Sequence, residues 1–270
     1  MSSPARPDIA EAAEILPADD TGPMAGRTVV LLHARPADRS MWSAHLREFA
    51  AAGLRAIAVD LPGYGDAAGC TVDPWTAVAE TLAARGVRRC VLVGNSLGAL
   101  VALQVAAVNP DLVEGLVALG YRPHDQPPSA MLQAAWDQEH ASLARGDIDG
   151  AVRAGVAAWT APSTPEAAKD LVARALRTNV EHRARNGEPT AGADPLQRPG
   201  GLRSLHVPAL VAVGALDMPD FFDGGEALAR ELGAGPLVVV PGAAHLVPLD
   251  QPTAFRRLIL DFLDTLEDPE

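Results

Sequence analysis

The chain has 270 residues, of which 48% are hydrophobic, and its formal net charge is −12 at pH 7. That length and composition suffice for one large core, or for a core with a modest inserted subdomain. The excess of acidic residues repels phosphate backbones and anionic lipid surfaces, so neither nucleic acid nor a membrane is expected as a partner.

The composition indicates neither a secretory signal nor a disulfide framework. The first twenty residues contain acidic side chains and lack an uninterrupted apolar stretch flanked by basic residues. No segment is long and apolar enough to span a bilayer. The two cysteines, Cys70 in a Gly-rich loop and Cys90 at the start of an apolar run, do not favour a structural disulfide. We expect a cytoplasmic protein that is a monomer or a homodimer.

Short apolar runs rich in β-branched residues alternate with longer helical stretches from residue 28 onward. This alternation is typical of an α/β fold, a mostly parallel central sheet flanked by helices. In chain order the expected strands are 28–33, 54–60, 90–94, 112–119, 207–214 and 237–241. Helices are expected at 41–52, 74–85 and 97–108, bounded by glycine or proline. The apolar residues before residue 27 show no clear periodic spacing, so the sequence predicts neither a helix nor a strand there.

Strand-like runs disappear between residues 121 and 205. Three helices are expected there, at 129–145, 148–159 and 165–185, and the stretch 186–203 is expected to be a loop rich in Gly, Pro and Asp. We therefore expect a core of residues 1–120 and 206–270. A helical cap, residues 121–205, is inserted after one strand of its sheet.

The sequence Gly94-Asn95-Ser96-Leu97-Gly98 joins a buried strand to a helix. A nucleophile on such a turn has strained backbone geometry, and side chains at the flanking glycines would collide with the neighbouring strand or helix. The turn lifts the Ser96 hydroxyl above the sheet, where the backbone amide of Leu97 can bind a developing oxyanion. The pattern indicates a catalytic serine, with a plain Gly/Ser turn as the alternative.

From residue 27 onward the chain resembles the α/β-hydrolase superfamily. Residues 29–36, Val-Val-Leu-Leu-His-Ala-Arg-Pro, are similar to the family's His-Gly-x-Pro region, with Ala34 where glycine is usual. The resemblance implies that the backbone amide of Arg35 is the second oxyanion donor and that the Arg35-Pro36 bond is a candidate for the cis form. Residues 59–65 resemble the family's turn after the next strand, in which Asp60 is expected to fix the loop.

A serine hydroxyl is a weak nucleophile until an imidazole accepts its proton. Of the seven histidines, His245 is favoured because it follows the strand 237–241 at the same sheet edge as Ser96 and matches the family's Pro-Gly-x-x-His stretch. A loop histidine with satisfied hydrogen bonds is the alternative. His124 could line the pocket, although an exposed loop position is favoured, and His140 is expected on a cap helix beside charged residues.

The histidine needs a carboxylate to hold its tautomer and to stabilise the imidazolium. Asp217 follows the strand 207–214, and the chain order Ser, Asp, His is the order expected for this fold. The resemblance favours Asp217 over Asp220, one turn later. Asp220 and Asp223 are expected to cap the next helix and to face solvent.

Five residues are candidates for the substrate pocket: Ala34, Tyr121, Trp136, Trp159 and Leu246. For the two tryptophans, and for Met131 and Leu132, packing of the cap on itself is the favoured alternative. No pair of His or Cys residues has zinc-ligand spacing, so neither a metal nor a cofactor is expected.

The resemblance implies a serine hydrolase that cleaves a small carboxylic ester or lactone through an acyl-enzyme on Ser96. The stretches around His33, Asp217 and His245 look most like esterases and enol-lactonases. The Gly-Asn-Ser sequence is also similar to carbon–carbon hydrolases of ring-cleavage products, but those typically carry tryptophan where this chain has Leu246. A perhydrolase and a receptor-like ligand-binding protein with vestigial activity are further alternatives.

Overall fold

The computed structural model describes residues 14–187, 192–198 and 201–266. Within these residues seven strands form one sheet in the order β1-β3-β2-β4-β5-β6-β7. The pair β1 and β3 is antiparallel, and all the other neighbours are parallel. The strands are β1 (Ala18–Thr21), β2 (Thr28–Leu32), β3 (Arg55–Val59), β4 (Cys90–Asn95), β5 (Val113–Leu119), β6 (Ala209–Gly214) and β7 (Val238–Val240).

Alternate residues of the central strands enter two separate cores, one on each face of the sheet. Val30 and Leu32 of β2 join one core, whereas Val29 and Leu31 join the other. Every residue of β2 and β3 is buried, which is why these strands read as continuous apolar runs. The first core includes helices α2 (Pro74–Ala84), α3 (Leu97–Val108) and α7 (Pro219–Leu232), and the second includes α1 (Ser43–Ala51) and α9 (Pro252–Leu263).

The expected α/β architecture is confirmed, and each of the six expected strands is present with shifts of at most a few residues at its ends. The edge strand β1 was not predicted from the sequence. Its sequence, Ala-Asp-Asp-Thr, is half exposed and has no apolar alternation. Pairing with β3 and the ion pair of Asp20 with Arg55, at 2.7 Å, hold it in place.

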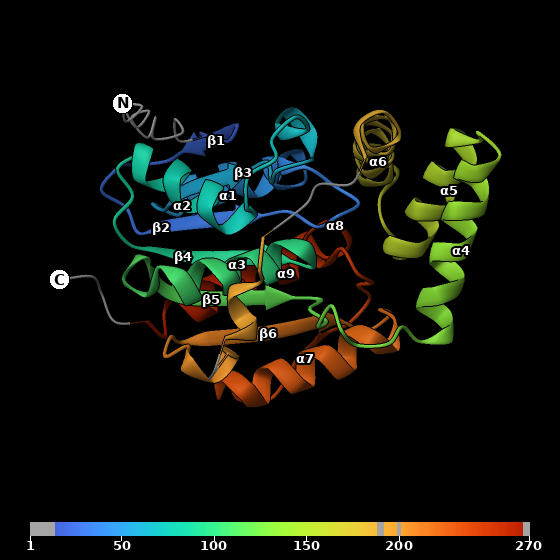
Figure 1. Cartoon of the computed structure of the whole chain (residues 1–270). Helices are drawn as coiled ribbons and strands as arrows, with labels where there is room; N and C mark the ends of the chain where they lie inside the picture. The colour runs from blue at the N-terminus through green and yellow to red at the C-terminus, as the bar shows by residue number, and fades with distance from the viewer. Residues whose placement is uncertain (1–13, 188–191, 199–200, 267–270) are drawn as a thin grey trace, which may run out of the picture.

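Three helices lie together beyond the carboxyl ends of the strands (Figure 1). They are α4 (Ala130–Ala144), α5 (Ile148–Trp159) and α6 (Glu166–Asn186), within a residue of the expected cap helices. Ser129 caps α4 by accepting from the Leu132 amide, and Asp147 caps α5 by accepting from the Gly150 amide. The division into core and cap at residues 121 and 205 stays a prediction.

Parts of the expected core and return loop, residues 1–13, 188–191, 199–200 and 267–270, lie outside the described residues. The described part of the return loop contains two short 3₁₀ turns, Pro195–Gln197 and Gly201–Ser204. Among the described helices, none combines the length and the apolar character that crossing a bilayer requires.

Candidate active site

Ser96 occupies the sharp turn between β4 and α3. Its φ of 56° and ψ of −111° make it the one residue other than glycine with a positive φ in the described part of the chain. Its amide is tied to the end of β5 by a 2.8 Å hydrogen bond to the Leu119 carbonyl. A non-glycine residue persists in such a conformation only where its surroundings enforce it, and such residues cluster at functional sites.

Both glycines of the turn are required by close backbone approach. A β-carbon at Gly94 would lie 2.2 Å from the Gly98 carbonyl oxygen, and one at Gly98 would lie 2.1 Å from the Leu32 carbonyl oxygen. No side chain fits at these distances. The first turn of α3 therefore packs directly against the end of β2, as expected from the motif.

His245 and Asp217 are brought together from two loops. Nδ1 of His245 lies 2.9 Å from Oδ2 of Asp217, and both side chains are almost completely buried. The other carboxylate oxygen, Oδ1, accepts from the Met218 amide at 2.8 Å. Because Nδ1 donates to a carboxylate, the tautomer of His245 leaves Nε2 as the proton acceptor.

Close packing between two loops brings the histidine to this position. A β-carbon at Gly214, the last residue of β6, would lie 2.0 Å from the Ala244 carbonyl oxygen, so the loop before His245 rests on the end of that strand. Asn95, beside the serine, donates from Nδ2 to the His245 carbonyl at 3.1 Å. The chain around Ser96 therefore also fixes the backbone of His245.

The imidazole of His245 packs against two aromatic rings, with centroid separations of 4.1 Å to Phe221 and 4.9 Å to Trp159. On another side lies Gly120, with φ +56°, where a β-carbon would approach the Cε1 and Nδ1 atoms of His245 to 3.1 Å. These neighbours leave the ring little room to move. Its orientation is fixed by packing as well as by Asp217.

Asp250, in the short helix α8 (Val247–Asp250), links the histidine loop to the cap. Oδ2 accepts from the Ala244 amide at 2.7 Å, while Oδ1 accepts from the Ala161 amide at 3.1 Å and from the Thr164 hydroxyl. Burial raises the pKa of this carboxyl, and the three donors act in the opposite direction. One buried side chain thus joins the residue before His245 to the connection between α5 and α6.

The two expected oxyanion amides lie on adjoining segments. Leu97 is the first residue of α3, so its amide has no acceptor one turn earlier within the helix. Arg35 follows β2, whose end touches α3 at Gly98. The turn containing Arg35 is closed by a 3.0 Å hydrogen bond from the Ala37 amide to the Ala34 carbonyl, and the Arg35-Pro36 bond is trans. The expectation of a cis bond is therefore wrong.

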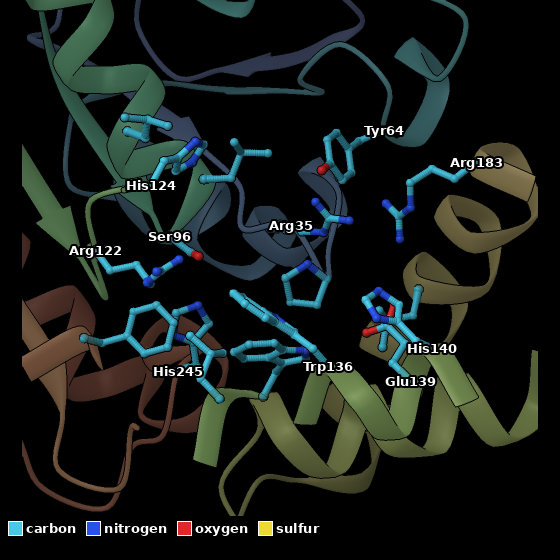
Figure 2. Close-up of a pocket in the computed structure, with 17 residues that line it drawn as sticks. Arg35, Tyr64, Ser96, Arg122, His124, Trp136, Glu139, His140, Arg183 and His245 are labelled. Atoms are coloured by element: carbon cyan, nitrogen blue, oxygen red, sulfur yellow. The ribbon is translucent and has the colours of Figure 1, made fainter. Parts of the chain in front are cut away.

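A cavity of about 390 Å³ lies between the sheet edge and the cap helices (Figure 2). Ser96 and His245 line it together, as do Leu97 and the side chain of Arg35. Asp217 is not in its wall and reaches the site through His245. The lining residues are Arg35, Pro36, Tyr64, Ser96, Leu97, Leu100, Arg122, His124, Leu132, Trp136, Glu139, His140, Trp159, Leu176, Arg183, Phe221 and His245.

Of the five residues expected in the pocket, Trp136 and Trp159 line the cavity. For Ala34, Tyr121 and Leu246 the expectation is wrong. Ala34 and Leu246 are fully buried in the core on the α1 and α9 face, and Tyr121 belongs to the core on the other face. Their position next to site residues in the sequence misled the prediction, because the backbone turns their side chains away from the cavity.

Several cavity residues were missed, above all the basic ones. Arg122 lies three residues past Leu119, the end of β5, so its place near the carboxyl edge of the sheet was a usable signal. His140 and Arg183 lie on the long helices α4 and α6, and only the packing of the cap determines which helical face meets the cavity. His124 is exposed, as expected, and also lines the cavity.

His33 and Asp60 organise the loops beside the serine. Nδ1 of His33 lies 2.9 Å from the carbonyl of the next residue, and Nε2 accepts from the Leu61 amide at 3.0 Å. Burial lowers the pKa of His33, which keeps it neutral. Asp60 accepts from the Arg39 and Asp66 amides, at 2.8 Å each, and pairs with the Arg39 guanidinium. The loop-fixing role expected of Asp60 is confirmed.

Asp220 stands in α7 but binds the start of the cap. Its Oδ1 accepts from the Ser129 amide at 2.7 Å, and its Oδ2 accepts from the Ser129 hydroxyl. The side chain is 1% exposed. The expectation that it caps its own helix or faces solvent is therefore wrong, whereas Asp223 is exposed.

Comparisons with known proteins identify relatives of this chain. The chain is 33% identical over 257 residues to a pimeloyl-[acyl-carrier protein] methyl ester esterase of Neisseria meningitidis serogroup C, covering 90% of this chain and 95% of that protein. A thermophilic esterase from Thermogutta terrifontis superposes with a TM-score of 0.72 at 26% identity, covering 92% of this chain and 93% of that one.

An enol-lactonase from Burkholderia xenovorans shares the fold, with a TM-score of 0.74 at 20% identity over 92% of this chain and 96% of that one. The family model of the alpha/beta hydrolase family matches residues 29–258. That match covers most of the chain, including the serine turn, the aspartate loop and the histidine loop. The chain belongs to the alpha/beta hydrolase family.

Proposed function

We propose that this chain hydrolyses a carboxylic ester or lactone by acyl transfer to Ser96. The observation that carries the proposal is the 2.9 Å contact of His245 Nδ1 with Asp217 Oδ2, on a histidine that shares its cavity with a serine in strained backbone geometry. An imidazole held in this tautomer presents Nε2 as a base, which is the requirement for activating a serine hydroxyl.

In the proposed first step Ser96 Oγ attacks the carbonyl carbon while His245 Nε2 takes the hydroxyl proton. The carbonyl oxygen becomes an oxyanion, which the backbone amides of Leu97 and Arg35 stabilise. His245 then gives the proton to the leaving alkoxide oxygen, and the acyl group stays on Ser96. Asp217 stabilises the transient imidazolium without taking a proton itself.

In the second step a water molecule gives a proton to His245 and attacks the acyl-enzyme. The tetrahedral intermediate collapses, His245 returns the proton to Ser96, and the carboxylic acid leaves. For a lactone the leaving oxygen stays attached to the acyl chain, so the product is a hydroxy acid. The chemistry therefore needs only the chain's own groups and water.

The relatives support an ester bond as the bond cleaved. The Neisseria protein is named as a methyl ester esterase and the Thermogutta protein as an esterase. Small leaving alcohols suit a cavity of about 390 Å³, which accommodates a small substrate.

The test is steady-state hydrolysis of short and medium p-nitrophenyl esters and of lactones by wild type, Ser96→Ala and Ser204→Ala. Ser204 is exposed and donates only to the Gly201 carbonyl in the described structure, so its variant controls for the loss of a hydroxyl. We expect Ser96→Ala to lose at least about 10⁴-fold in kcat and Ser204→Ala to match wild type. Full turnover by Ser96→Ala, or no turnover of any ester or lactone by wild type, would contradict the proposal, and the latter result would favour a ligand-binding protein.

A further inference from the structure

The cavity differs sharply in charge from the molecule as a whole. The chain carries a formal net charge of −12, yet three arginines line the cavity, Arg35, Arg122 and Arg183. Among the described lining residues Glu139 is the one carboxylate. A cationic side chain on a half-enclosed wall is a favourable partner for an anionic ligand.

The three arginines come from separate parts of the fold. Arg35 follows β2, Arg122 follows β5, and Arg183 lies on α6 of the cap (Figure 2). The Arg183 guanidinium lies over the Tyr64 ring, 5.9 Å from its centroid. No single basic segment of the sequence supplies all three arginines, so they come together only when the chain folds.

Contacts to both its backbone and its side chain fix the position of Arg122. A β-carbon at Gly224 of α7 would lie 2.7 Å from the Arg122 Cα, so the helix packs tightly on its backbone. The guanidinium lies over Trp136, 5.6 Å from the ring centroid, and Nη2 donates to the Gln126 carbonyl. In Figure 2 the side chain extends toward Ser96. These contacts hold the backbone of Arg122 and one flat face of its guanidinium. The group is therefore already oriented for a hydrogen-bond acceptor in the cavity.

Arg122 and Arg35 also act on the neighbouring side chain of His124. Partial burial in the cavity wall lowers the pKa of His124, and the positive charges of Arg122 and Arg35 lower it further, against the opposing charges of Asp194 and Asp125. His124 also lines the cavity. The charges of these two arginines thus disfavour a further positive charge beside them and favour an anion.

We infer that the cavity selects substrates that carry an ionised carboxylate in addition to the ester or lactone bond, and that Arg122 binds this carboxylate. The inference rests on the proposed function and names its substrate class, an acidic monoester or lactone acid. A guanidinium matches the two oxygens of a carboxylate with parallel N–H donors. Arg35 and Arg183 are further cationic side chains in the same wall, each with contacts of its own within the protein.

The test compares two substrates with the same reacting group, monomethyl glutarate and dimethyl glutarate, at pH 7.5. We expect wild type to have the higher kcat/KM for the monoester, whose free carboxyl is ionised. Arg122→Met should lower the ratio of the two kcat/KM values about 10- to 100-fold, mainly through KM for the monoester. Arg122→Lys, which keeps the charge but not the paired donors, should fall between the two.

The matched control is Arg257→Met, which removes the same charge from an exposed side chain of α9. It should leave the ratio at the wild-type value. No preference for the monoester in wild type, or an unchanged ratio in Arg122→Met, would overturn the inference while leaving the proposed hydrolase function standing.

Failure of the proposed function gives a different result, because wild type then hydrolyses neither ester. In that case the carboxylate site is tested directly by calorimetric titration of wild type and Arg122→Met with glutarate. Binding that Arg122→Met weakens at least about tenfold supports the site. Equal binding to both proteins, or none to wild type, overturns it.

Discussion

Replacing Gly120 with alanine should damage catalysis as well as stability. Gly120 has a φ of +56°, and its missing β-carbon leaves space for the imidazole of His245. Alanine in this left-handed conformation costs about 1–2 kcal/mol of folding free energy. Its methyl group would also stand 3.1 Å from the Cε1 and Nδ1 atoms of His245, closer than the ordinary contact of 3.4–4 Å.

The imidazole must therefore move by a few tenths of an ångström, and its surroundings resist that movement. Asp217 holds Nδ1 at 2.9 Å, and the rings of Phe221 and Trp159 flank the imidazole. Misplacing a catalytic group by 1 Å can cost about 10²-fold in rate, so the smaller shift expected here should lower kcat about tenfold.

Gly233→Ala is the matched control. Gly233 has a similar φ of +63°, at the end of α7, and no described atom lies within 4 Å of a β-carbon there. Both variants should lose a similar unfolding free energy in urea titrations, whereas only Gly120→Ala should lose kcat in ester hydrolysis. Equal kcat in the two variants would refute the packing argument.

Three further outcomes are expected. Asp217→Asn should lower kcat about 10⁴-fold in ester hydrolysis, because an amide favours the wrong tautomer of His245; a loss below tenfold would contradict the assignment. Asp250→Asn should lower the unfolding free energy by about 1–3 kcal/mol in urea titrations, because only one of the two side-chain atoms of an amide accepts hydrogen bonds. A variant as stable as wild type would argue against the link between the histidine loop and the cap. Burial lowers the pKa of both His33 and His45, so the unfolded chain binds protons more tightly than the folded chain. Their contribution is complete above about pH 6.5 and is lost below it, by at most about 1.4 kcal/mol per pH unit for each histidine. His45→Gln should therefore lose less stability than wild type between pH 7 and pH 5, and an equal loss would contradict the reasoning.

The reacting groups were predictable because each belongs to a local pattern that backbone geometry enforces. A β-carbon at Gly94 would lie 2.2 Å from neighbouring backbone, and one at Gly98 would lie 2.1 Å from it, so the turn requires both glycines of the motif. Asp217 and His245 each follow an apolar strand, and the carboxyl ends of parallel strands share one edge. The expected chain order of Ser, Asp and His then left few other candidates for the base and the acid.

The cavity wall was less predictable because it depends on which way side chains point after the cap has packed. Leu246 is adjacent to His245 and yet belongs to the core, whereas Arg183, on a helix inserted between two strands, lines the cavity. The edge strand β1 was missed for a related reason. Its two aspartates gain their roles from pairing with β3 and from arginines farther along the chain, Asp20 from Arg55 and Asp19 from Arg39.

The most direct test of the account is intact-protein mass spectrometry after treatment with a fluorophosphonate, which bonds covalently to serines activated by an imidazole. Wild type should gain one adduct, located by peptide mapping on Ser96, and Asp217→Asn should gain it far more slowly. Ser96→Ala should remain unmodified. An unmodified wild type, or the same adduct on Ser96→Ala, would contradict the claim that His245 activates this serine.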